Sequence, residues 1–210
     1  QDTLSNQLVV VKLVHNSNQE YCARFRCEVQ TTAFLKHEHI LPALAHGEYE
    51  DWCYMVSPYI KDGTLLERLV QEPLSLDEVD DILTQVASAL QFAHDSGFVH
   101  RDIKPSNILL RDKKHVLLAD FGLAKQMDGD DHLTITGHLI GTPEYMAPEL
   151  AEEQATIKSD VYALGIVVYQ LLTGKVPFKG STPIGTYLKQ IRECPLPPTA
   201  LNPTIPEAVQ

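Results

Sequence analysis

The feature that most constrains this chain is a polar loop with a short apolar run on either side. The loop reads His100-Arg101-Asp102-Ile103-Lys104-Pro105-Ser106-Asn107. Phe98-Val99 precedes it, Ile108 to Leu110 follows it, and both runs are short enough to be strands rather than helices. A further apolar run, Val116 to Ala119, leads directly into Asp120-Phe121-Gly122. We therefore expect short strands that bracket the loop, with Asp120 at the end of a neighbouring strand.

The side chains of this region suit the transfer of a phosphoryl group. Such a reaction needs a base beside the attacking hydroxyl and oxygen ligands for Mg²⁺, but little covalent chemistry from the protein. Asp102 is placed as the base, while Asn107 and Asp120 carry the oxygen atoms that a hard cation prefers. Lys104 can neutralise charge that develops on the transferred group. The alternative is that this region is only a charged surface loop. In that case the four residue types at positions 102, 104, 107 and 120 would have these spacings by chance.

Together with the later Ala147-Pro148-Glu149, these motifs resemble the catalytic core of a protein kinase. The lysine two residues after the aspartate is typical of the serine/threonine-directed branch. The resemblance extends from about Leu8 to Phe178, and in the region from Phe25 to Glu48 bacterial members resemble the chain most. It implies a bilobal α+β fold of the protein-kinase type. It also implies transfer of the γ-phosphoryl group from ATP, with Mg²⁺, to serine or threonine hydroxyls of proteins.

The same resemblance implies the residues that bind the nucleotide. Val9-Val10-Val11-Lys12 resembles the V-A-I-K strand of the family, in which the lysine contacts the α- and β-phosphates. A carboxylate from the next helix holds that lysine; Glu28 fits best, and the alternative Glu20 stands in a polar stretch. In the adenine-binding segment, Ser57 takes the gatekeeper position. The residues implied to bind ATP are Lys12, Glu28, Val10, Pro58, Ile60, Leu109 and Asp120.

Further residues are implied to regulate or support the site. Family members with an arginine before the catalytic aspartate often use it to bind a phosphate on the activation loop. In this chain the arginine is Arg101, and the alternative is that it has a purely structural role. That loop corresponds to Leu123 to Ile140. Asp160 would hold the backbone of the catalytic loop, and Thr142 would hydrogen-bond toward Asp102 and Lys104. The regulatory candidates are Arg101, Thr134, Thr136 and Thr142.

The pattern of apolar residues divides the chain near residue 60. We expect residues 1–60 to form a partial N-lobe with the hinge, and residues 61–210 to form a partial, mainly helical C-lobe. The expected strands of the N-lobe are Leu8 to Val14, Ile40 to Gly47 and Cys53 to Ser57, with a helix from Arg24 to Lys36. In the C-lobe, we expect one helix to begin at the capping box Ser75-Leu76-Asp77-Glu78. Two further helices are expected from Lys158 to Leu172 and from Ile184 to Arg192. No clear element is expected in the proline-rich tail after Cys194, through Pro206.

Composition limits the other classes of function. The formal charge of −11 and the pI near 5.2 argue against a nucleic-acid-binding protein. The four cysteines show no CxxC spacing, which favours a reduced, cytoplasmic compartment. The most apolar stretch, Val161 to Leu172, is shorter than the ~20 residues that a membrane span needs. Anchoring through a segment outside these residues stays open.

Two parts of the family pattern are missing from this sequence. No glycine precedes Lys12, whereas the family has a Gly-rich loop there, and no arginine follows Arg192 to pair with Glu149. We therefore expect a fragment of a longer kinase in which Glu149 is a buried carboxylate without a partner. The alternative is a non-catalytic nucleotide-binding pseudokinase or scaffold. A small-molecule kinase is less consistent with Gly141 to Glu149, which resembles the family's docking segment for protein substrates. Dimerisation for autophosphorylation stays open.

Overall fold

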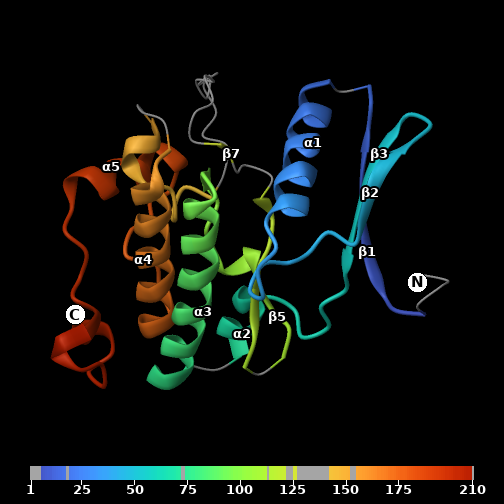
Figure 1. The fold of residues 1–210 in the computed structure, drawn as a ribbon. Helices are drawn as coiled ribbons and strands as arrows, with labels where there is room; N and C mark the ends of the chain where they lie inside the picture. Colours follow the sequence, from blue (N-terminus) through green and yellow to red (C-terminus); the bar gives the residue numbers. More distant parts are fainter. Residues whose placement is uncertain are drawn as a thin grey trace.

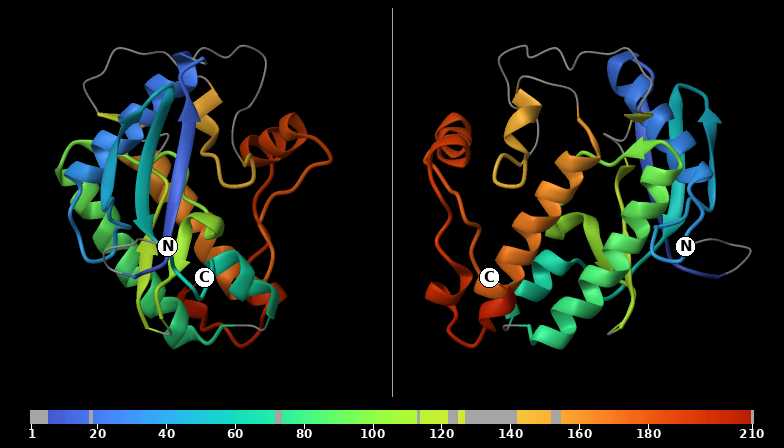
Figure 2. Two further views of the ribbon diagram at one scale, coloured as in Figure 1. Left: turned by 90° about the vertical axis from the view of Figure 1, so that its right-hand side faces the viewer. Right: turned by 60° about the vertical axis from the view of Figure 1, so that its left-hand side comes forward.

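A small antiparallel sheet forms the N-terminal part of the computed structural model (Figure 1). The structure describes residues 6–17, 19–71, 74–112, 114–121, 125–126, 142–151 and 155–209. The strands lie in the order β1-β3-β2. Their bounds are Val9–His15 for β1, Ala45–Tyr49 for β2 and Trp52–Pro58 for β3. Figure 2 shows the three strands side by side, with one helix, α1, behind them.

Alternation of side chains along β3 explains how the sheet packs on α1 (Gln19–Phe34). Every second residue of β3 is buried, as expected for a strand with one covered face. The helix covers that face, and the two elements share a small apolar core. The members of this core are Cys22, Phe25, Val29, Cys53 and Met55. The predicted helix began at Arg24; the observed one begins five residues earlier and includes Glu20, which the sequence had suggested to be in a loop.

Helices dominate the rest of the described chain. The helices are α2 (Leu65–Gln71), α3 (Leu76–Asp95), α4 (Ile157–Thr173), α5 (Pro183–Arg192) and α6 (Pro198–Leu201). The predicted capping box of α3 is present, because Ser75 and Glu78 bond each other's backbone N–H groups. Thr156 and Ser159 form a second box at the start of α4. That helix ends at Gly174, whose φ of 74° suits glycine.

Short strands and turns connect these helices near the polar loop. The strands are β4 (Phe98–Val99), β5 (Ile108–Leu110), β6 (Val116–Leu118) and β7 (Lys125–Gln126). The 3₁₀ turns are η1 (Pro105–Asn107), η3 (Pro148–Ala151) and η4 (Glu207–Val209). β5 pairs antiparallel with β6, and β4 pairs with β7. The predicted short strands on both sides of the loop are therefore present.

The main apolar core lies between α3 and α4 and also includes residues from the N-terminal part. Leu35 and Ile40 are almost fully buried in the same cluster as Val86 and Val167. Ile40 forms a single parallel bridge with Leu118 instead of starting a strand. The predicted strand from Ile40 to Gly47 was wrong at its start, because the backbone there hydrogen-bonds to β6. The division into lobes at residue 60 stays a prediction.

The C-terminal segment packs on the side of α4 away from α3 (Figures 1 and 2). The prediction of no clear element between Cys194 and Pro206 was wrong, since α6 forms there. The 3₁₀ turn η4 follows beyond this stretch. Ile205 is only 4% exposed and joins the main core. The Asn202 side chain donates to the carbonyl of Leu172 over 2.9 Å, which fixes the segment to the end of α4. In the described part of the chain, no helix is long and apolar enough to cross a membrane.

Candidate active site

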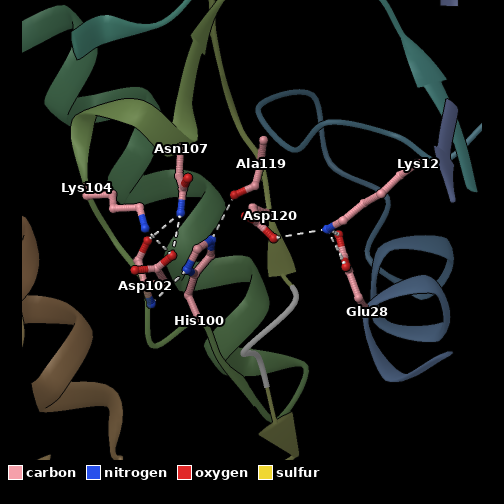
Figure 3. A network of polar contacts seen from close by, with 8 residues as sticks. All are labelled: Lys12, Glu28, His100, Asp102, Lys104, Asn107, Ala119 and Asp120. Atoms are coloured by element: carbon pink, nitrogen blue, oxygen red, sulfur yellow. Dashed lines mark hydrogen bonds and ion pairs between the residues drawn. The ribbon is translucent and has the colours of Figure 1, made fainter. Parts of the chain in front are cut away.

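An ion pair between β1 and α1 forms the N-terminal half of the site (Figure 3). The Nζ atom of Lys12 lies 2.7 Å from both carboxylate oxygens of Glu28. The Glu28 side chain is 5% exposed, whereas that of Lys12 is 45% exposed. Burial raises the pKa of Glu28, and the hydrogen bond and charge of Lys12 oppose that rise. The pairing that the sequence favoured, between Lys12 and Glu28, is present.

The same ammonium group also faces the end of β6. Lys12 Nζ lies 3.6 Å from Oδ1 of Asp120, whose side chain is 48% exposed. Asp120 has a φ of 66°, which is unusual for a residue other than glycine and which the surrounding structure must enforce. Lys12 therefore has one buried carboxylate on one side and one exposed carboxylate on the other.

The catalytic loop brings Asp102 together with Lys104 and Asn107. Lys104 Nζ donates to Asp102 Oδ2 over 2.6 Å, and Asn107 Nδ2 donates to the same oxygen over 2.9 Å. Asn107 Nδ2 also donates to the carbonyl of Asp102 over 2.8 Å. The two donors fix the carboxylate from both sides, and they leave the amide oxygen of Asn107 without a hydrogen bond in the described part of the chain. The 3₁₀ turn η1, which opens at Pro105, makes this return of Asn107 toward Asp102 geometrically possible.

His100 connects this loop to the strand that carries Asp120. The ring is fully buried and packs against Phe121, with ring centroids 4.6 Å apart. Its Nδ1 accepts the backbone N–H of Asp102 over 3.3 Å, and its Nε2 donates to the carbonyl of Ala119 over 3.2 Å. Burial lowers the pKa of His100, which agrees with a neutral ring that accepts at one nitrogen and donates at the other. Figure 3 shows that these contacts link the two halves of the site.

The buried carboxylate of Asp160, on α4, holds the loop from behind. It accepts the backbone N–H groups of His100 and Arg101, each over 2.8 Å. This confirms the predicted tie between the buried helix and the catalytic-loop backbone. His94 on α3 adds a third hydrogen bond at 2.8 Å. Sequence reasoning missed His94: its helical spacing from Leu90 indicates a buried position, but nothing in the sequence names its partner.

Comparison with known proteins decides the family. The family model described as "Protein kinase domain" matches residues 1–208. The chain belongs to this family. Its small sheet with α1 and its helical remainder are the mixed arrangement that the resemblance implies, so the predicted α+β kinase fold class is confirmed.

Several curated bacterial relatives match almost the whole chain. The probable serine/threonine-protein kinase PknB of Lactococcus lactis is 36% identical over 99% of this chain and 34% of its own length. The serine/threonine-protein kinase PrkC of Bacillus subtilis is 35% identical over 100% of this chain and 33% of its own length. The serine/threonine-protein kinase PknA of Mycobacterium tuberculosis is 39% identical over 96% of this chain and 48% of its own length. The chain thus spans about a third of the first two relatives and about half of the third.

The hinge of this kinase domain joins β3 to α2. Strand pairing sets Val10 opposite Ser57 and Val9 opposite Pro58. Ser57, the predicted gatekeeper, is 6% exposed. Tyr59 N–H donates to the carbonyl of Leu8 over 3.2 Å, whereas the backbone groups of Ile60 have no partner in the part of the chain that the structure describes. Leu109 lies half-buried on β5, opposite Leu117. The roles of these residues in adenine binding stay predictions.

The predicted regulatory residues are only partly described. Arg101 has a φ of 71°, and its Nε atom is buried without a hydrogen-bond partner in the described chain. Burial lowers the pKa of Arg101, and the charge of Asp160 opposes this. Among the described residues, Thr142 makes no hydrogen bond to Asp102 or Lys104, although Thr142 and Lys104 line one pocket. Thr134 and Thr136 lie outside the described residues.

The surroundings of Glu149 differ from the expectation. Its Oε1 accepts a hydrogen bond from Ser159 Oγ over 3.0 Å, and the side chain is only half-buried. The expected buried carboxylate without a partner is therefore wrong for this structure. The hydroxyl of Tyr162 is buried with no hydrogen-bond partner in the described chain. Burial first, and then the charge of Glu149, raises the pKa of Tyr162 to about 12, so this hydroxyl stays protonated.

The chemistry of the donor set fits a magnesium ion. The exposed Asp120 carboxylate and the unengaged amide oxygen of Asn107 are hard oxygen donors, which Mg²⁺ prefers. Within the described ranges, no cluster of three or more His, Cys, Asp or Glu residues forms an all-protein metal site. In phosphoryl-transfer enzymes, Mg²⁺ usually binds through one or two protein ligands together with substrate phosphates.

Removal of the Asp160 carboxylate should destabilise the domain. Asp160→Ala leaves the backbone N–H groups of residues 100 and 101 buried without acceptors, at about 1–3 kcal/mol each. We expect the free energy of unfolding, measured in urea, to fall by about 3 kcal/mol or more. Asp80→Ala, on the exposed face of α3, is the control and should change it by less than about 0.5 kcal/mol. Equal effects of the two variants would contradict the anchoring role.

Proposed function

We propose that this domain transfers the γ-phosphoryl group of ATP to serine or threonine hydroxyls of proteins. The observation that supports it best is the Asp102 carboxylate, which Lys104 and Asn107 fix at 2.6 and 2.9 Å. The Lys12–Glu28 pair, which reaches Asp120 across the two parts of the structure, is the second support. The names of the bacterial relatives agree with this activity.

In the proposed reaction, the substrate hydroxyl oxygen forms a bond to the γ-phosphorus. The bond from that phosphorus to the β–γ bridging oxygen breaks, and ADP leaves with the electron pair. Asp102 orients the hydroxyl and takes its proton. Lys104 stabilises negative charge on the transferred group. Mg²⁺, when bound, would neutralise charge on the phosphates, and Asn107 and Asp120 would hold it.

Binding of ATP would use both parts of the structure. Lys12 would contact the α- and β-phosphates, and Glu28 would keep its ammonium group in place. Val10 and Leu109 would pack on the two faces of the adenine. Pro58 has no N–H to donate, but its carbonyl can still accept a hydrogen bond from the edge of the adenine. The backbone N–H and carbonyl of Ile60 would complete the hydrogen bonds to this edge. This arrangement corresponds to the proposed division into an N-lobe (residues 1–60) and a C-lobe (residues 61–210).

The main alternative is a pseudokinase that binds nucleotide without catalysis. The two functions differ in phosphoryl transfer but share ATP binding. A test must therefore measure both properties on the same protein.

Substitution of the proposed base should separate chemistry from binding. Asp102→Asn should lower kcat by about 10²–10⁴-fold, because a positioned base contributes that much. Its Kd for MgATP should stay close to that of the unsubstituted protein, measured by calorimetry, since Asp102 faces the hydroxyl and not the nucleotide. Lys12→Met should instead weaken MgATP binding. ATP binding without any phosphoryl transfer by the unsubstituted protein would support the pseudokinase.

A second prediction concerns activation. The buried Nε of Arg101 lacks a partner in the described chain, and a phosphate could accept from such a guanidinium. We expect phosphorylation at Thr134 or Thr136 to raise kcat, measured before and after phosphatase treatment. The Thr134→Ala/Thr136→Ala variant should lose this response, and the exposed control Ser181→Ala should keep it. Full activity of the double alanine variant would refute the proposal.

A further inference from the structure

A pocket of about 550 Å³ lies next to the catalytic loop, outside the residues assigned so far to ATP. Its walls come from η1, from the segment that begins at Thr142, and from the C-terminal end of α4 with the turn after it. Its volume is in the range of sites that bind small molecules or short peptide segments. Lys104 lines the pocket and also donates to Asp102 over 2.6 Å, so the pocket adjoins the proposed base.

The charge of this pocket is opposite to that of the whole chain. The chain has a formal charge of −11, with 28 acidic and 17 basic residues. The charged residues that line the pocket are three lysines, Lys104, Lys175 and Lys179, and a single acid, Glu144. A local excess of cations on an acidic protein attracts anionic groups selectively.

Two of these lysines are available to a ligand. Lys175 and Lys179 are exposed, and their ammonium groups have no ion-pair partner in the part of the chain that the structure describes. Lys104, in contrast, is held by Asp102. The pocket thus joins two uncommitted cations to one that is bound to the catalytic carboxylate.

A neutral hydrogen-bond donor adds to the cations. The Tyr145 hydroxyl donates to Oε1 of Gln170 over 2.5 Å, and both residues line the pocket. Burial raises the pKa of Tyr145 to about 12, so the hydroxyl remains a donor at neutral pH. Because this bond engages the Gln170 oxygen, the amide Nε2 is left as the free end of that side chain within the described structure. An amide N–H₂ group and ammonium groups together suit a carboxylate.

We propose that this pocket binds aspartate or glutamate side chains of protein substrates, within a few residues of the acceptor hydroxyl. The proposal rests on the proposed kinase function, because the hydroxyl at Asp102 and the carboxylate in the pocket belong to one peptide. Lys175 and Lys179 are its specificity-determining residues. An extended peptide advances about 3.3 Å per residue, so acids three to six residues from the hydroxyl lie about 10–20 Å away along the chain.

The chain itself contains a sequence of this kind. Asp128, Asp130 and Asp131 precede Thr134 by six, four and three residues. A second copy of the chain would therefore offer a matching substrate in this segment, which agrees with autophosphorylation between molecules. The segment supplies a natural probe for the test.

The test uses two synthetic peptides and the full-length gene product that contains this chain. One peptide has the sequence of residues 126–138, and the other carries Asn in place of Asp128, Asp130 and Asp131. We expect kcat/KM to favour the acidic peptide by about tenfold, which corresponds to 1.4 kcal/mol, with the difference mainly in KM. The preference should shrink as salt is raised above 0.1 M, where the Debye length is about 10 Å.

Charge reversal in the pocket should remove this preference. Lys175→Glu/Lys179→Glu should lower the ratio of the two kcat/KM values to about one or below, as expected for like charges in the same site. Lys36→Glu/Lys158→Glu has the same change in net charge at exposed positions outside the pocket, and should keep the ratio. Loss of the preference in both double variants would show a general field effect and overturn the assignment.

A binding measurement separates this proposal from the kinase function. Fluorescence anisotropy with labelled peptides reports the Kd without phosphoryl transfer. Equal phosphorylation and equal Kd values of the two peptides would overturn the pocket and leave the kinase function intact. Tighter binding of the acidic peptide that depends on Lys175 and Lys179, without any transfer, would sustain the pocket and contradict the kinase function.

Discussion

The geometry of the site depends on one buried acid, Asp160. A carboxylate that is 1% exposed has lost its hydration, and this cost is offset only if the surrounding donors replace the water. Three donors do so: two consecutive backbone N–H groups, of His100 and Arg101, and the ring of His94. Arg101, whose N–H is one of these donors, has a φ of 71°, a conformation that the surrounding structure must enforce. The hydrogen bonds to Asp160 hold this strained conformation. The carboxylate of the next residue, Asp102, accepts from Asn107 and Lys104.

The second constraint is the way in which the two parts of the molecule are connected. Leu35 and Ile40 follow α1, yet they are buried in the core that α3 and α4 form. The backbone of the same segment exchanges hydrogen bonds with Leu118, since Leu118 N–H donates to His39 and Leu41 N–H donates to Leu118. Because Leu118 precedes Asp120 by two residues, the end of α1 and the end of β6 are held together. This explains how Lys12 can approach Asp120, which lies in the other part of the structure, while it stays paired with Glu28 on α1.

Sequence patterns predicted those parts of the structure that depend on local chemistry. The capping box at Ser75, the stop at Gly174 and the short strands around the loop all follow from spacing and residue type. The start of β2 and the elements after Cys194 were missed, because burial of Ile40 and Ile205 in a distant core decides them, and a single sequence does not show that contact. The Lys12–Glu28 pair could be named only through the family resemblance, since sixteen residues separate the partners. Nothing in the sequence names the partner of His94, or shows that the Nε of Arg101 has no hydrogen-bond partner in the described structure.

Three lysines, Lys12 at the ion pair and Lys175 and Lys179 at the pocket, show that burial determines how similar groups bind their partners. Lys12 is bound to a carboxylate that is 5% exposed, so loss of the lysine would leave a desolvated charge and force Glu28 to take up a proton. Salt therefore screens this pair less than a pair between two exposed groups. Lys175 and Lys179 are exposed and unpaired in the described structure, so their attraction for an anion is weak per group and screened by salt. In the proposed function, the fixed ammonium group of Lys12 suits a nucleotide that is the same in every reaction cycle. The exposed ammonium groups of Lys175 and Lys179 suit the proposed peptide substrates, which must bind, be distinguished by their charge, and dissociate.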